Sequence, residues 1–157
     1  MTRTMSAAVF AVALAASSAQ PVFADVSRTV ISAFHGQLVV TKDELPEGKN
    51  DKDTITKIKA AQLKTVEGTA KGDVTGWNFH YTAFLTKTGA THLKLDFMNG
   101  DKLAADQQLD GVDPKSSVLT GDISIDEDEG LAKGKSYVIK LVTSNDAVVA
   151  STPLTFN

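Results

Sequence analysis

Apolar and polar residues alternate along most of the chain after residue 25, and this alternation predicts β-strands. The clearest case is the segment 77–86, in which every second residue is apolar. Those positions are Trp77, Phe79, Tyr81, Ala83 and Leu85. Because neighbouring residues of a strand point to opposite faces, the five side chains share one face. A face that is apolar over its whole length is normally part of a protein core.

Other segments follow the same rule, and turn-forming residues separate them. The expected strands are 26–41, 63–71, 77–86, 93–97, 103–109, 117–125, 136–143 and 147–156. Asn99-Gly100 and Asn145-Asp146 predict two tight hairpin turns. The shared apolar phase of Leu85 and Leu93 predicts a further hairpin between 77–86 and 93–97.

The segment 41–53 interrupts this pattern with Pro46, Gly48 and a high density of charged residues, so we expect a solvated loop. Ile55 and Ile58 follow at helical spacing, and Asp53 is a suitable N-cap. These features predict one short helix near 54–63. The threonines and the following valine are also compatible with a strand there.

Seven or eight short strands are typical of a β-sandwich or a small β-barrel. The run 131–139, with Leu131, Gly134 and Tyr137, favours the sandwich. It resembles the corner before the penultimate strand of immunoglobulin-like and fibronectin-type-III-like domains. The resemblance implies that the Tyr137 hydroxyl bonds to backbone near 131–134. The expected fold is therefore all-β, an antiparallel immunoglobulin-like β-sandwich of seven or eight strands in one domain, 25–157.

Residues 1–24 have the features of a secretory signal peptide. Arg3 gives a positive start, residues 7–16 are apolar, and Val22 and Ala24 place small residues before a cleavage site. We expect cleavage between Ala24 and Asp25. The apolar stretch is too short to span a bilayer. The predicted location of the mature chain is secreted or periplasmic.

Composition argues against several partners and chemistries. The 157 residues include no cysteine, so we expect no disulfide, no thiol nucleophile and no cysteine-linked lipid anchor. The formal net charge is −3, and Arg28 is the one arginine after the predicted leader. An acidic, arginine-poor surface argues against nucleic acid and against an anionic membrane surface. No later segment is apolar for long enough to span a membrane.

Two groups of side chains are candidate metal ligands. His35, His80 and His92 could bind a transition metal, but the expected hairpin places His80 and His92 roughly 20 Å apart. We therefore expect no transition-metal site. The acidic loop within 122–129 offers a weak calcium site whose candidate ligands are Asp126, Asp128 and Glu129. The acidic residues 126–129 are consecutive, which differs from the spacing of a calcium-binding loop and favours a solvated hairpin loop instead.

The aromatic residues of segment 77–86 allow a second interpretation, a sugar-binding platform on an exposed sheet face. The apolar continuation of that face favours core. The chain has no nucleophile-elbow, zinc-protease or glycine-rich phosphate motif, so we expect no catalytic residues and no cofactor.

Together these patterns predict a non-catalytic binding or structural module whose partner is an extracytoplasmic protein or a surface polymer. The segment 41–53 and the sheet edges are the expected contact surfaces. The alternative is a periplasmic protein that binds a metal or a small ligand, with calcium at 122–129 or with a cavity inside a small barrel. Because the strand pattern assigns nearly all large apolar residues to the core, we expect no apolar pocket.

Overall fold

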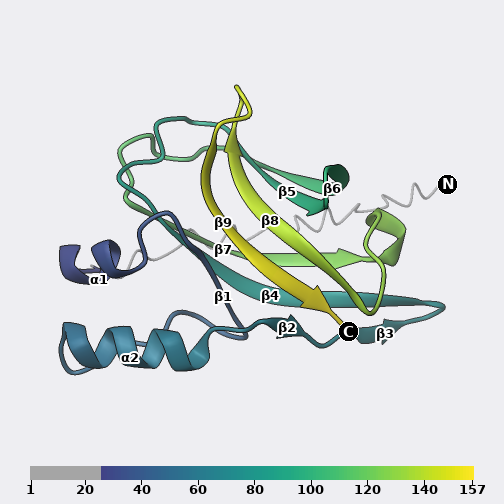
Figure 1. Cartoon of the computed structure of the whole chain (residues 1–157), viewed down its shortest axis with the longest axis horizontal. Coiled ribbons are helices and arrows are strands. Elements are labelled where there is room, and N and C mark those ends of the chain that lie inside the picture. The colour runs from purple at the N-terminus through teal and green to yellow at the C-terminus, as the bar shows by residue number, and fades with distance from the viewer. Residues whose placement is uncertain (1–25) are drawn as a thin grey trace, which may run out of the picture.

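The computed structural model describes residues 26–157 (Figure 1). The predicted signal peptide and its cleavage site lie outside the described residues. Two sheets, whose strands are mostly antiparallel, pack over a common core. The expected all-β sandwich is therefore confirmed.

Sheet A contains five strands. Their order is β2 (Thr65–Val66), β9 (Val148–Phe156), β8 (Lys135–Thr143), β5 (Leu93–Asn99) and β6 (Lys102–Leu109). The pairing is antiparallel except between β2 and β9. Both predicted tight turns are confirmed, since β5 and β6 join at Gly100 and β8 and β9 join at Asp146. These two residues have φ of 62° and 58°, the left-handed conformation that a tight hairpin turn requires.

Sheet B is built around the long strand β4 (Val74–Phe84). Strand β7 (Val118–Asp126) pairs along one edge of β4, and β1 (Leu38–Thr41) and β3 (Thr69–Lys71) pair with separate parts of its other edge. The expected hairpin between 77–86 and 93–97 is wrong, because β4 and β5 belong to different sheets. Two segments in the same apolar phase both face the core, and this holds equally for strands that lie across the core from each other.

The main core lies between the two sheets. Trp77, Phe79 and Tyr81 of β4 are each at most 3% exposed, so the core interpretation is confirmed and the sugar platform is wrong. Phe156 of β9 lies among these aromatic rings. Its ring centroid is 5.4 Å from that of Trp77 and 5.7 Å from that of Tyr137, both in edge-to-face geometry. Such pairs stabilise a core beyond the burial of their area.

Helix α1 (Arg28–Ala33) occupies a segment that the sequence predicts as a strand, so that prediction is wrong. The Ser27 hydroxyl accepts a hydrogen bond from the Val30 amide and caps the helix. Val30 and Phe34 are buried, and their spacing of four places them on one helical face. Burial of this face outweighs the strand preference of the β-branched residues.

Helix α2 (Asp51–Ala61) confirms the expected helix, although it begins earlier than predicted. Its N-cap is Asn50 rather than Asp53, because the Asn50 side chain accepts from the Asp53 amide at 3.0 Å. The two helices pack together at one end of sheet B (Figure 1). With sheet B they form a second, smaller core of Val30, Phe34, Val39, Ile58 and Phe84. This core buries β4 on both faces at its end.

The expected strand 63–71 is divided into β2 and β3, which lie in different sheets. Gly68 lies at the crossing point. A Cβ atom there would lie 2.2 Å from Thr75 Cγ2 and 2.8 Å from Trp77 Nε1. The crossing therefore depends on a residue without a side chain.

The predicted corner bond of Tyr137 is confirmed. Its hydroxyl accepts from the Ala132 amide at 2.9 Å, and the side chain is buried. The bond ties the loop after the short 3₁₀-helix η1 (Glu127–Glu129) to the beginning of β8.

Candidate functional site

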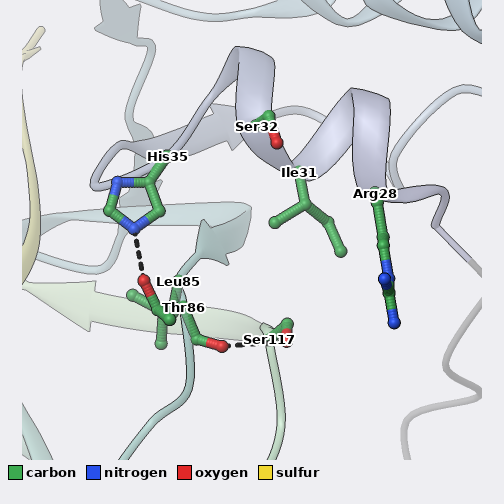
Figure 2. Close-up of a pocket in the computed structure, with 7 residues that line it drawn as sticks. All are labelled: Arg28, Ile31, Ser32, His35, Leu85, Thr86 and Ser117. Carbon is green, nitrogen blue, oxygen red and sulfur yellow. Dashed lines mark hydrogen bonds between the residues drawn. The ribbon is translucent and has the colours of Figure 1, made fainter.

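An open pocket of about 470 Å³ lies beside helix α1, and Figure 2 shows the residues that line it. Its walls come from three separate parts of the chain: α1 and its following turn, the two residues after β4, and the residue before β7. The lining residues are Arg28, Ile31, Ser32, His35, Leu85, Thr86 and Ser117. The expectation of no apolar pocket is wrong here, because the pocket exists only where α1 packs as a helix.

The helical spacing of α1 explains which side chains reach the pocket. Val30 and Phe34 turn inward to the small core. Arg28, Ile31 and Ser32 are three and four residues apart, so they share the neighbouring face of the helix. This three-and-four spacing was the available sequence signal for the site. It remains hidden as long as the segment is interpreted as a strand.

Hydrogen bonds hold the strand side of the pocket in place. The imidazole Nε2 of His35 lies 2.7 Å from the Thr86 hydroxyl. The Ser117 hydroxyl donates to the Thr86 carbonyl at 3.1 Å, and the Leu85 amide donates to the Ser117 carbonyl at 2.8 Å. The polar rim is thus fixed by bonds between the turn after α1 and the two strands.

The charge of the pocket is positive. Arg28 lines it, whereas no aspartate or glutamate does. Within residues 26–157 the guanidinium of Arg28 has no salt-bridge partner and no side-chain hydrogen bond. In Figure 2 the Arg28 and His35 side chains stand at opposite ends of the pocket, and Ile31 lies between them. The site therefore combines one cation, several hydroxyl groups and an apolar patch.

The three histidines lie in different surroundings. His35 is at the pocket, His80 is buried in β4, and His92 bonds Asp110 at 2.8 Å just before β5. The hairpin from which the separation of His80 and His92 was predicted does not form, because His80 pairs with Asp122 of β7. The described part of the chain contains no group of three His, Asp or Glu side chains that could hold a metal.

His80 belongs to a hydrogen-bonded row that sequence reasoning did not identify. Its Nδ1 lies 2.9 Å from the Asp122 carboxylate and its Nε2 lies 2.5 Å from the Thr120 hydroxyl. The order hydroxyl, imidazole, carboxylate matches that of a hydrolase triad. However, the Thr120 hydroxyl is also bonded to the Tyr81 carbonyl at 3.0 Å. The row therefore joins β4 to β7, and none of its three residues lines the pocket beside α1.

The acidic loop uses its carboxylates to order its own backbone. Asp126 accepts from the Asp128 amide, and Glu129 accepts from the Asp126 amide at 2.9 Å, which forms a capping box around η1. Glu127 accepts from the Thr75 amide, and this bond holds the pKa of Glu127 below its usual value. The candidate calcium ligands Asp126, Asp128 and Glu129 therefore lie along a helical turn and do not surround a common point.

The segment 41–53 is anchored to the rest of the molecule. Its first residue ends β1 and its last three residues lie in α2. The Gly48 amide donates to the Thr54 hydroxyl, and the Lys49 amide donates to the Asp53 carboxylate, both at 2.9 Å. Leu45 packs against the small core. The segment is therefore an ordered loop that leads into α2 and has an exposed outer side.

The outer side of sheet A carries a row of apolar residues. Leu103, Met98, Val138 and Pro153 are register neighbours across β6, β5, β8 and β9. Leu103 is 50% exposed and Val138 is 38% exposed. The helices pack instead against one end of sheet B (Figure 1). The row is thus the second feature of the described residues that could contact a partner.

Among residues 26–157, no helix is long and apolar enough to cross a membrane. Comparison of the chain with protein-family models, curated proteins and solved structures finds no match. The geometry of the chain itself therefore carries the functional argument.

Proposed function

We propose that this protein is a non-catalytic binding module that acts outside the cytoplasm and takes a small ligand in the pocket beside α1. One observation carries the proposal: a cation, several hydroxyls and an apolar patch converge on one concave site. Small-molecule sites typically combine an apolar surface with a few placed polar groups in volumes of roughly 300–1,000 Å³. The pocket lies within that range.

Both walls of the pocket are held in place by buried residues, which is what a binding site requires. Leu85 is only 2% exposed and belongs to the main core, so the strand wall is part of the rigid sandwich. The helix wall is fixed by Val30 and Phe34 in the small core. The pocket holds one hydroxyl bonded to a base, Thr86 with His35 at 2.7 Å, but among residues 26–157 its lining includes no carboxylate that could orient the imidazole. This favours binding over catalysis.

The extracytoplasmic location rests on the predicted leader of residues 1–24. We further infer an immunoglobulin-like fold. Taking β1, β4, β5, β6, β7, β8 and β9 as the seven principal strands, the third, sixth and seventh are neighbours in sheet A, as in immunoglobulin domains. The Tyr137 corner bond also supports this inference. The fourth strand departs from the constant-domain arrangement, because β6 pairs with β5 rather than with a strand of sheet B.

The proposal can be tested by NMR screening of small molecules against the mature chain. A bound compound should shift the amide signals of Ser32, His35, Thr86 and Ser117. Ser32→Trp should abolish these shifts by filling the pocket. Ala33→Trp is the matched control, since Ala33 is exposed on the same helix and does not line the pocket. If no compound class perturbs the pocket, or if Ser32→Trp binds as well as Ala33→Trp, the proposal is wrong.

A second candidate function, protein recognition, is favoured by the apolar row on sheet A. Its exposed side chains lie in a row across four paired strands, which distinguishes them from scattered surface residues. Introducing Leu103→Glu and Val138→Glu together should abolish cross-linking of an extracytoplasmic protein to Lys140, which lies on the same strand face. Lys52→Glu on α2 should leave the cross-link intact. A cross-link that survives the double substitution would exclude this face.

A further inference from the structure

We propose that the ligand of the α1 pocket is a small organic monocarboxylate with an aliphatic body, bound through the guanidinium of Arg28. This inference rests on the proposed function, because it names the ligand class of the same pocket. Its evidence is the charge, the donor set and the shape of the pocket.

The charge of the pocket favours an anion. Its lining residues include Arg28 and no carboxylate, in a chain whose formal net charge is −3. Within residues 26–157 no aspartate or glutamate pairs with Arg28. A guanidinium group presents two parallel N–H donors that match the two oxygens of a carboxylate. An anion bound there would therefore accept hydrogen bonds from the Arg28 guanidinium, which the described residues leave without a side-chain partner.

The single charge favours a monoanion. Arg28 is the one arginine after the predicted leader, and no lysine lines the pocket. A phosphate ester carries more charge and is commonly held by several cations or by a cradle of backbone amides. The pocket lining has neither a second arginine nor a lysine. One guanidinium, whose two parallel N–H donors match the two oxygens of one carboxylate, suits a monoanion.

The apolar wall favours an aliphatic body. Ile31 lies between Arg28 and His35 in Figure 2, and Leu85 contributes a second apolar side chain to the lining. A carboxylate bound at Arg28 would extend its chain along Ile31. The volume of about 470 Å³ exceeds what a bare inorganic anion would fill. The hydroxyls of Thr86 and Ser117 at the strand side would meet a polar group at the far end of the ligand.

The test is titration of the mature protein with hexanoate, followed by NMR. Hexanol and hexylammonium serve as probes of equal chain length without the negative charge, and hexyl phosphate serves as the dianionic probe. Hexanoate should bind more tightly than the other three. Arg28→Gln should weaken hexanoate binding by at least about tenfold, which is what the loss of one charged hydrogen-bonded pair predicts. Lys57→Gln removes a positive charge from α2, away from the pocket, and should leave the affinity unchanged.

The outcomes separate this inference from the proposed function. If hexanol binds the pocket as well as hexanoate, or if Arg28→Gln does not affect hexanoate, the pocket binds ligands but the carboxylate inference is wrong. If hexyl phosphate binds best and requires Arg28, the site recognises phosphate and the inference is also wrong. If none of the four probes shifts the pocket signals, the inference is wrong, and the broader compound screen decides the proposed function.

Discussion

Single residues in the core combine apolar burial with one specific hydrogen bond. Trp77 is fully buried against Phe156, yet its indole nitrogen still donates to the Asn157 carbonyl at 2.9 Å. Tyr137 buries its ring in the same cluster and accepts from the Ala132 amide. The polar atoms of these aromatic residues thus fix how the ends of strands meet, while their rings supply the hydrophobic stabilisation.

Trp77→Ala should reduce the free energy of unfolding by about 3–5 kcal/mol, because the change leaves a large cavity and removes the bond to Asn157. Urea denaturation followed by circular dichroism measures this loss. The buried indole of the unaltered protein should also emit at short wavelength and resist iodide quenching. A solvent-like emission spectrum would contradict the burial.

Tyr137→Phe should cost roughly 1 kcal/mol through loss of the hydrogen bond to Ala132. Tyr81→Phe is a matched control, since both tyrosines are buried and the Tyr81 hydroxyl has no hydrogen-bond partner among residues 26–157. Urea midpoints for the two variants compare the effects directly. Equal losses would show that the corner bond contributes nothing specific.

Burial, with a smaller contribution from the charge of Asp122, raises the pKa of Tyr81 from 10.0 to about 12. The folded state therefore holds this proton more tightly than the unfolded state. The associated stability is fully present below pH 10 and is lost as pH rises toward 12, by about 2–3 kcal/mol in total. Unfolding of the native protein and of Tyr81→Phe across this range should diverge, with the variant losing less. Parallel curves would refute the shift.

At the scale of elements, helix α2 depends on the chain that leads into it. The Gly48 amide bonds Thr54, and Leu45 packs on the small core, so the segment 41–53 is part of the helix architecture. The sequence predicts a solvated loop there, which is correct for the residues between β1 and α2. Its anchoring depends on contacts with α2 that its composition does not reveal.

Gly48→Ala should destabilise this element, because a Cβ atom would lie 2.3 Å from the Thr54 nitrogen. Such overpacking against backbone costs about 1–3 kcal/mol. Lys49→Ala is the control at the adjacent, exposed position. Amide hydrogen exchange at 51–56 should accelerate in the glycine variant alone. Unchanged exchange would show that the loop adapts without cost.

At the scale of the whole molecule, residues 26–157 contain two cores of very different size. Among the described residues, twenty-three buried side chains lie between the sheets, whereas five lie beneath the helices. Stability within a protein follows this distribution of buried contacts. The helix wall of the pocket rests on the smaller core and therefore lies on the more easily opened part of the fold, whereas its Leu85 wall belongs to the main core.

We predict that the amides of α1 and α2 exchange with solvent faster than those of β4, β5 and β8. Ile58→Ala should increase exchange in the helices while leaving the central strands protected, because Ile58 belongs to the small core alone. Native-state hydrogen exchange measures both effects. Uniform acceleration across helices and strands would show that the two cores unfold as one unit.

The sequence by itself determined the strands with clear alternation, both tight hairpin turns, the core face of β4, the short helix α2 and the corner bond of Tyr137. The strands, turns and helix follow from neighbouring residues and a local period, such as the alternation from Trp77 to Leu85. The corner bond follows from the resemblance of 131–139 to the corner of immunoglobulin-like domains. Strand partners, the helical state of α1 and the pocket were decided by tertiary structure. Leu85 and Leu93 would share an apolar phase whether their strands paired in one sheet or faced each other across the core. Val30 and Phe34 lie on one face of a helix because that face packs against Phe84 in the small core. Arg28 and Ser117 become neighbours of one site only after the chain has folded, since a contact between distant segments has no local pattern.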